Sequence, residues 1–240
     1  MRLDVFLTEN GYVSSRTEAK HFISDGAVKI DGRIITKPAF DIDESSNVEI
    51  DKSSKKYVSR GGLKLEAALE AFGVSAEGKS AVDIGASSGG FTDCLLKHGA
   101  ARVIAVDSGT AQLVSSLRED SRVICVENYN ARYMKIDDLA FIPELAVMDV
   151  SFISATYIIK SIFECLSDDG EFICLIKPQF EVGRANIGKG GIVKNEKVRE
   201  AAKRDVIAFA ESIGFKFIGS ITSPIVGGDG NTEYLAYFRK

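Results

Sequence analysis

The chain has 240 residues, of which 45% are hydrophobic and 27% charged, and its formal net charge is −4. This composition is typical of a globular protein and excludes a disordered, collagen-like or disulfide-scaffold chain. No apolar run approaches the roughly 18 residues of a membrane-spanning helix, and the first residues lack the apolar core of a signal peptide. We therefore expect a cytoplasmic protein of one to two domains, without a membrane partner.

Residues 1–51 predict a small α+β unit. Apolar residues at helical spacing predict one helix that begins near Leu3 and stops at Gly11, and a second that is capped at Ser14 or Ser15. The alternation at 28–30, the turn at Asp31-Gly32 and the apolar pair at 48–50 predict short strands.

Residues 52–59 predict a basic linker. From Lys52 to Lys64 the chain carries only basic charges, whereas residues 41–51 carry five acids and no base. This segregation allows a local face to bind an anion although the whole chain is acidic. A solvated linker that binds nothing specific is the alternative.

Residues 60–240 predict a second, α/β domain. A helix from about Leu63 is expected to end at Gly73, and strands then alternate with helices. The predicted strands are 80–84, 101–106, 123–126, 145–148 and 171–176, and the predicted helices are near 90–98, 155–166 and 196–213. This alternation indicates a parallel sheet that is covered on both faces. The last two strands, 215–221 and 233–238, are predicted to form an antiparallel hairpin at one end of the sheet.

The four cysteines predict buried, reduced thiols. They are widely spaced, form no C-x-x-C pair and lie in apolar stretches, at Cys94, Cys125, Cys165 and Cys174. The two histidines lie in unrelated segments without ligand spacing, so we expect no metal site.

The segment from Ala81 to Thr92 is the strongest motif. Its glycines read G-x-x-x-G-G after a strand, which is neither a dinucleotide fingerprint nor a P-loop. Asp83 precedes the first glycine, and a carboxylate there would repel a phosphate but suit a cationic or amine-bearing ligand. Asp107 ends the next strand, where an acid binds ribose hydroxyls. These features favour S-adenosylmethionine, although a tight turn that needs glycine for its backbone alone is the simpler alternative.

With these motifs, residues 80–240 resemble the Rossmann-like methyltransferases of the FtsJ type, and residues 1–51 resemble the S4 RNA-binding module. The whole chain resembles the TlyA (hemolysin A) family of ribosomal RNA 2′-O-methyltransferases. The resemblance implies a seven-stranded mixed sheet with helices on both faces, and S-adenosylmethionine as cofactor. It implies a cofactor site made by Asp83, Gly85, Ala86, Ser87, Gly89, Gly90, Phe91, Thr92, Asp107, Asn130 and Asp149.

The resemblance also implies a catalytic Lys-Asp-Lys-Glu set, which this chain matches at Lys64, Asp149, Lys177 and Glu233. Three of these residues lie at predicted strand ends, where side chains project into the ligand crevice of a parallel sheet. A ribose 2′-hydroxyl is a weak acid, so we expect Lys177 to act as its base and Asp149 and Glu233 to position that lysine. Lys64 is expected to lower the pKa of Lys177, which the two acids would raise, and to hold the ribose or phosphate.

Ribosomal RNA, or a ribosomal subunit, is the implied partner. The target is expected to be cytidine in large-subunit RNA, with small-subunit RNA as a second candidate. Residues 180–197 form a basic, glycine-rich loop that we expect to close over RNA. The candidate RNA contacts are Arg2, Arg16, Lys20, Lys29, Lys37, Lys55, Lys56, Arg60, Arg184 and Lys189.

Three other functions remain as alternatives. An amine methyltransferase is weakly suggested by Asp149 followed by Phe152, although the segment lacks the prolines of that motif. A catalytically inactive RNA-binding protein and a membrane-active hemolysin, as the family's name suggests, are the others. The sequence does not indicate an oligomeric state.

Overall fold

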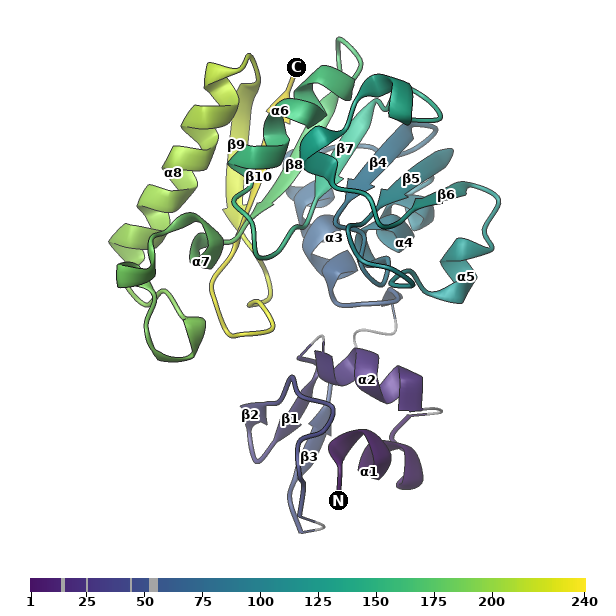
Figure 1. Ribbon diagram of the computed structural model, residues 1–240, viewed down its shortest axis with the longest axis vertical. Helices are drawn as coiled ribbons and strands as arrows, with labels where there is room; N and C mark the ends of the chain where they lie inside the picture. Colours follow the sequence, from purple (N-terminus) through teal and green to yellow (C-terminus); the bar gives the residue numbers. More distant parts are fainter. Residues whose placement is uncertain (14–15, 25, 44, 52–55) are drawn as a thin grey trace.

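The protein is described by a computed structural model that covers residues 1–13, 16–24, 26–43, 45–51 and 56–240. A small α+β domain lies below a larger α/β domain in the view of Figure 1. Ser14 and Ser15, the predicted caps, and Lys55, with the first half of the predicted linker, lie outside the described residues.

The N-terminal domain contains the two predicted helices and the predicted short strands, which form a three-stranded antiparallel sheet of order β2-β1-β3. Its elements are α1 (Leu3–Glu9), α2 (Arg16–Ser24), β1 (Val28–Ile30), β2 (Arg33–Ile34) and β3 (Val48–Ile50). The helices pack together and on the sheet through a small apolar core that includes Leu3, Leu7 and Ile23.

A buried carboxylate holds the start of this domain together. Asp4 is fully buried in α1, and its two oxygens accept hydrogen bonds from Arg2 (3.0 Å) and from Arg16 of α2 (2.9 Å). Hydrogen bonds from these two guanidinium groups outweigh burial and lower the pKa of Asp4 to about 2. Both arginines were predicted to bind RNA, and the structure gives each of them a partner within the domain.

The second domain is a seven-stranded sheet with helices on both faces, which confirms the predicted fold class. The strand order is β6-β5-β4-β7-β8-β10-β9. Its strands are β4 (Ser80–Ile84), β5 (Arg102–Val106), β6 (Val123–Val126), β7 (Leu145–Met148), β8 (Glu171–Ile176), β9 (Lys216–Thr222) and β10 (Tyr234–Arg239). β4 to β8 are parallel to one another, whereas β10 is antiparallel to both of its neighbours, as expected for the last hairpin.

Alternate residues of the strands supply the cores on the two faces of the sheet. In β7, Leu145 and Val147 pack with α3 and α4, whereas Ala146 and Met148 pack with α6 and α8. The helices are α3 (Gly61–Phe72), α4 (Gly90–Lys97), α5 (Ser115–Arg118), α6 (Thr156–Cys165), α7 (Pro178–Glu181) and α8 (Glu196–Ser212), and the 3-10 turns are η2 (Ala131–Tyr133), η3 (Ile136–Asp138), η4 (Arg184–Asn186) and η5 (Lys189–Gly191). Gly73 ends α3 in the left-handed conformation, at φ 65°, which is why glycine suits that position.

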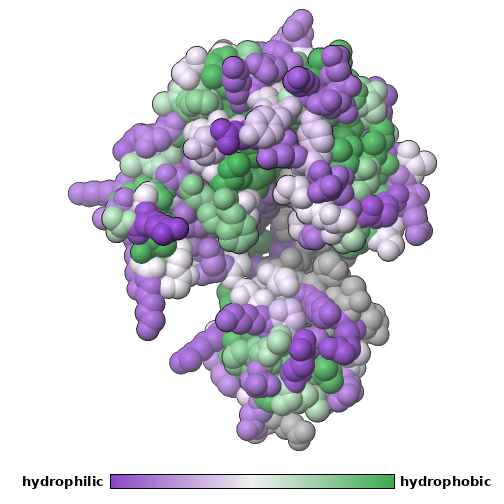
Figure 2. Space-filling view, viewed as in Figure 1, coloured by the Kyte–Doolittle hydropathy of each residue, from purple (hydrophilic) through white to green (hydrophobic). Residues whose placement is uncertain are grey.

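The sheet topology places a crevice at the carboxyl ends of β4 and β7. Chain connections leave these neighbouring strands in opposite directions, to β5 on one side and to β8 on the other. Ligands of open α/β sheets bind where the strand order reverses in this way. The N-terminal domain lies next to this edge of the sheet (Figure 1), and the surface is hollowed between the two domains (Figure 2).

Among the described residues, none of the helices has the length and apolar character that crossing a bilayer requires. Three of the cysteines are buried, as predicted, whereas Cys125 on the edge strand β6 is only half-buried.

The Asp4 cluster predicts an acid-sensitive N-terminal domain. The folded pKa lies below the value of about 3.9 in an unfolded chain, so its stabilisation is present above pH 4 and lost as the pH falls toward 2. We expect Asp4→Asn to lower the free energy of unfolding by about 1 kcal/mol at pH 7, because the arginines are half exposed. Denaturant unfolding from pH 7 to 2 measures this, and Glu9→Gln, an exposed acid at the end of α1, is the control. An equal loss in both variants would contradict the role of Asp4.

Candidate active site

Two cavities meet at the carboxyl ends of β4 and β7. The first, which we call the cofactor cavity, has a volume of about 470 Å³ and lies between the loops that follow β4, β5, β6 and β7. The second, which we call the acceptor cavity, has a volume of about 250 Å³ and lies between the β4 loop, α3 and the end of β8. Asp149, Gly85, Ser87 and Ser151 line both cavities, so ligands in the two would touch at these residues.

Asp107 is fixed at the wall of the cofactor cavity. One of its carboxylate oxygens accepts a hydrogen bond from the Ser87 backbone (2.7 Å) and the other accepts one from the Gly109 backbone (2.7 Å). Each oxygen has a second lone pair for a hydroxyl donor. This position suits a ribose, as the sequence analysis expects.

The apolar part of the cofactor cavity offers a slot for a flat ring. Tyr129 and Asn130 from the loop after β6 contribute to it. Its apolar residues include Ile84 of β4, Val106 of β5, Ile153 of the loop after β7 and Ile158 of α6. A cavity of this volume that combines an apolar slot with polar groups such as Asp107 and Asn130 is typical of a nucleoside-sized ligand site.

Gly85 allows the backbone of the β4 loop to approach β7 closely. Its φ is +82°, and a Cβ atom built at this position would lie 2.4 Å from the Asp149 carbonyl oxygen. Any other residue would displace the end of β7, and with it Asp149. The predicted need for glycine here therefore has a concrete steric reason.

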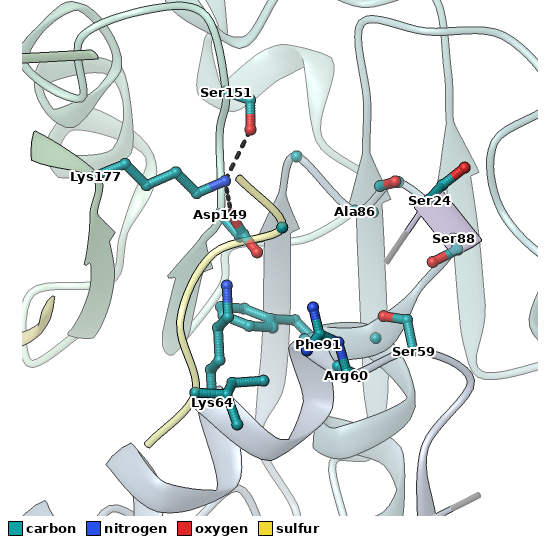
Figure 3. Close-up of a pocket in the computed structure, with 16 residues that line it drawn as sticks. Ser24, Ser59, Arg60, Lys64, Ala86, Ser88, Phe91, Asp149, Ser151 and Lys177 are labelled. Carbon is teal, nitrogen blue, oxygen red and sulfur yellow. Dashed lines mark hydrogen bonds and ion pairs between the residues drawn. The ribbon is translucent and has the colours of Figure 1, made fainter. Parts of the chain in front are cut away.

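The structure brings the four predicted catalytic residues together. Lys177 forms an ion pair with Asp149 (2.5 Å) and donates a hydrogen bond to Ser151 (2.8 Å), as Figure 3 shows. Lys64 of α3 donates to Glu233 (2.6 Å), and both of these side chains are buried. Figure 3 shows Lys64 and Lys177 reaching toward Asp149 from two different elements.

Strand pairing explains how Glu233 reaches this group. β10 runs antiparallel to β8, and its first residue, Tyr234, pairs with Ile176, the last residue of β8. Glu233 and Lys177 are the next residues on either side of that pair, so both must lie at the same edge of the sheet.

The pKa values of Lys177 and Asp149 are set by their charged neighbours. Burial alone would lower the pKa of Lys177, but Asp149 and Glu233 outweigh it, and the net pKa is raised. Burial would likewise raise the pKa of Asp149, but Lys177 and then Lys64 outweigh it and lower that pKa. The two acids thus raise the pKa of Lys177, as expected, and the expected lowering by Lys64, which pairs with Glu233, does not prevail.

Three predicted cofactor residues do not reach these cavities. Asp83, Gly89 and Thr92 line neither of them, whereas the other eight line at least one. Asp83 is fully buried and accepts a hydrogen bond from the Thr92 hydroxyl (2.6 Å). Burial and the nearby carboxylates of Asp149 and Asp107 raise its pKa to about 7. Asp83 thus lies beneath the glycine loop and supports it from below.

The predicted RNA contacts fall into two groups. Lys20, Lys29 and Lys37 in the N-terminal domain and Arg184 and Lys189 in the loop after α7 are exposed. Lys56 pairs with Glu66, and Arg60 is buried between the two domains at the acceptor cavity. The described part of the basic segment 52–64 is therefore not an open cationic face.

The N-terminal domain contributes to the acceptor cavity. Ser24, at the end of α2, lines it together with Arg60 and Gly228 of the β9–β10 loop. A Cβ atom built at Gly26 would lie 2.9 Å from the Arg60 guanidinium and 3.4 Å from the Gly228 backbone. The sequence analysis did not expect this domain to reach the active site.

Asn231 is a further residue that the sequence analysis did not single out. It is fully buried; its side chain accepts a hydrogen bond from the Val193 backbone (2.9 Å) and donates one to the Gly191 carbonyl (2.9 Å). It thereby joins the loop after α7 to the segment that carries Glu233. In the sequence, only its position two residues before the candidate catalytic acid Glu233 points to Asn231.

An exposed ring, Phe152, packs on the half-buried ring of Phe180 beside Lys177. Phe152 is 92% exposed with φ +64°, and its ring centroid lies 5.2 Å from that of Phe180. Both rings line a third cavity of about 480 Å³, together with Lys177 and Glu233. An apolar ring held in solvent beside charged catalytic side chains is a surface on which a base can stack.

The profile of the FtsJ-like methyltransferases matches residues 57–240, and that of the S4 domain matches residues 1–48. A relative from Brachyspira hyodysenteriae named Hemolysin A is 46% identical over 241 residues, with 99% of each chain covered. A Mycobacterium tuberculosis relative named 16S/23S rRNA (cytidine-2′-O)-methyltransferase TlyA is 39% identical, with 99% of this chain and 89% of the relative covered. A solved structure from Streptococcus thermophilus that carries the hemolysin name is 44% identical with a TM-score of 0.80, and covers 100% of this chain and 88% of its own. These relatives share both domains along their length.

The buried Lys64–Glu233 pair predicts strong coupling in stability. We expect Glu233→Leu alone to cost about 3 kcal/mol of unfolding free energy, because it leaves the Lys64 ammonium buried without its partner. Lys64→Met alone should also destabilise, whereas the double variant should recover most of the loss. Denaturant unfolding of the four proteins measures the coupling, and additive losses in the double variant would contradict it.

Proposed function

The chain belongs to the FtsJ-like methyltransferase family and carries an S4 domain, and from this premise we propose that it methylates the ribose 2′-hydroxyl of cytidine in ribosomal RNA. The observation that carries the proposal is the junction at Asp149. There, a cavity suited to a nucleoside opens onto a second cavity lined by Lys64, Lys177 and Asp149, and Glu233 pairs with Lys64 behind its wall. A group can pass between two ligands only where their sites touch, as these do.

S-adenosylmethionine is the cofactor that fits the first cavity. Asp107 would bind the ribose hydroxyls, the apolar slot with Asn130 would hold the adenine, and Asp149 would face the cationic part of the molecule. When bound, S-adenosylmethionine supplies an electrophilic methyl group on its sulfonium. None of these contacts requires a phosphate.

Lys177 is the residue that would take the proton of the ribose hydroxyl. Its raised pKa keeps it protonated at neutral pH in the structure described here, because Asp149 and Glu233 stabilise the ammonium. A cation bound next to Asp149 would compete for that carboxylate and so favour the neutral amine. Asp149 and Glu233 orient Lys177, and Lys64 adds positive charge to the acceptor cavity for a ribose or phosphate oxygen.

The proposal of cytidine in ribosomal RNA as the substrate is supported by the names of the relatives and by the S4 domain. The Mycobacterium tuberculosis relative is named for cytidine-2′-O methylation of 16S and 23S rRNA. Phe152 offers the exposed ring on which the target base would stack while its ribose enters the acceptor cavity. A buried lysine paired with Asp149 favours a hydroxyl acceptor over an amine, since an amine nucleophile does not need a strong base.

The direct test is to map 2′-O-methyl groups in ribosomal RNA from cells with and without the protein by mass spectrometry. We expect one or more cytidines to lose the modification and purified protein to restore it. Lys177→Ala should lower kcat by at least about 100-fold, as removal of a general base does. Unchanged methylation in the deletion strain, or full activity of Lys177→Ala, would refute the proposal; cofactor binding without transfer would instead indicate a catalytically inactive RNA-binding protein.

The charge arrangement predicts the pH dependence of kcat. Because only the neutral amine of Lys177 can accept the proton, and the two acids stabilise its ammonium, kcat should rise with pH by about tenfold per unit until the pKa of Lys177 in the ligand-bound enzyme is reached. Asp149→Asn removes the charge that stabilises the ammonium, so this limb should move to lower pH even as the maximum rate falls. Ser151→Ala, which removes an uncharged partner of Lys177, is the control and should leave the limb in place. Identical limbs in all three proteins would contradict Lys177 as the base.

A further inference from the structure

Two exposed tyrosines flank an arginine at the rim of the cofactor cavity. Tyr133 in η2 is 66% exposed and Tyr157 in α6 is 52% exposed. The guanidinium carbon of Arg132 lies 4.5 Å from the centroid of the Tyr157 ring and 5.7 Å from that of the Tyr133 ring. We call Arg132, Tyr133 and Tyr157 the tyrosine platform.

The platform is held in place by hydrogen bonds and by a buried anchor. Asn130 caps η2 by accepting a hydrogen bond from the Arg132 backbone (3.1 Å), and the Ser161 hydroxyl of α6 donates to the Arg132 carbonyl (2.9 Å). Ala131 and Met134, on either side of Arg132 and Tyr133, are buried. The backbone beneath the exposed rings is therefore fixed. Because of this, little conformational entropy would be lost when a ligand stacks on them.

Arg132 keeps its charge available. Within the described ranges, no carboxylate lies in ion-pair distance of its guanidinium, in contrast to Arg118, which pairs with Glu127 (2.6 Å), and Arg122, which pairs with Asp120 (2.7 Å). A guanidinium held by ring faces retains its donors for an anion such as a phosphate. Aromatic rings beside an unneutralised arginine are the combination that binds single-stranded nucleic acid.

The place of the platform relates it to the active site. Asn130 and Ala131, which precede Arg132, and Ile158, which follows Tyr157, line the cofactor cavity. Phe152, the proposed stacking partner of the target base, lines both that cavity and the one beside Lys177. A strand that places one nucleotide at Phe152 could therefore continue along the rim of the cofactor cavity toward the tyrosines.

We propose that the tyrosine platform binds unpaired RNA bases that flank the target nucleotide, with Tyr133 and Tyr157 stacking on bases and Arg132 contacting the backbone. This inference rests on the proposed RNA substrate but concerns a separate surface. The two tyrosines make no part of the cofactor cavity wall, so the platform contributes to RNA affinity and leaves the chemical step unchanged.

Because the chain contains no tryptophan, a single introduced tryptophan can report on stacking at the platform. Tyr133→Trp introduces a single fluorophore, whose emission should be quenched by a single-stranded oligocytidine of about 12 nucleotides when bases stack on it. An abasic ribose-phosphate of the same length should bind without this quenching. Ile142→Trp, at a position that is 53% exposed in the loop before β7, is the matched control and should not respond. Quenching equal to that of the control would overturn the stacking role.

Affinity and kinetics give the second arm of the test. Tyr133→Ala and Tyr157→Ala should each raise the Kd for the oligocytidine about fivefold, and the pair more, whereas Tyr→Phe variants and Ile142→Ala should bind as the parent does. Methyl transfer to ribosomal RNA by the Ala variants should show a raised KM, an unchanged kcat and unchanged cofactor binding.

The outcomes separate the two proposals. Loss of RNA affinity in the Ala variants, together with an inactive parent protein, would refute the methyltransferase function and leave the platform in place. Full activity with unchanged Kd and KM would refute the platform alone. A changed sedimentation coefficient with unchanged RNA affinity would assign the rings to contact between copies of the chain and would also refute the platform.

Discussion

Four charged side chains from distant parts of the chain meet at one point that is largely shielded from solvent, and the architecture around the active site follows from this constraint. Lys64 and Glu233 pair in one half of the group and Asp149 and Lys177 in the other. An unpartnered charge at such a site costs several kcal/mol, so each element can pack here only if its partner delivers the opposite charge. The insertion of β10 between β8 and β9 meets this requirement. Because β10 is antiparallel to β8, Glu233, the residue before β10, lies at the end of β8.

At the same edge of the sheet, the two cavities share one wall, which consists of the loop after β4 and the end of β7. Gly85 permits close contact with the Asp149 carbonyl, and Asp107 holds the Ser87 backbone at the common wall. The wall between the cavities is therefore thin and made of a loop and a strand end that cannot shift independently. A protein that brings two bound molecules into contact gains rate from this rigidity, since the reacting groups need no further alignment.

The RNA side of the molecule depends on local surfaces, since the chain has a net charge of −4. Several basic side chains that the sequence predicts as RNA contacts form ion pairs with acidic side chains of the protein, as Arg2 and Arg16 do with Asp4. In the proposed function, exposed rings compensate where cations are few: Phe152 beside Lys177, and Tyr133 and Tyr157 at the rim of the cofactor cavity. Stacking on such rings depends less on net charge than phosphate contacts do.

Periodicity and turn chemistry in the sequence determined the helices, the order of the strands along the chain and the final hairpin, because burial of alternate residues and glycine or aspartate turns are local properties. The resemblance to a family supplied the four candidate catalytic positions. Only the tertiary structure decided which charges pair, that Asp83 supports the glycine loop from beneath, that Ser24 of the first domain reaches the acceptor cavity, and that Asn231 joins two loops. These facts depend on contacts between residues far apart in the chain and on the exposure of individual rings, and neither is encoded in the spacing of residues along a single segment.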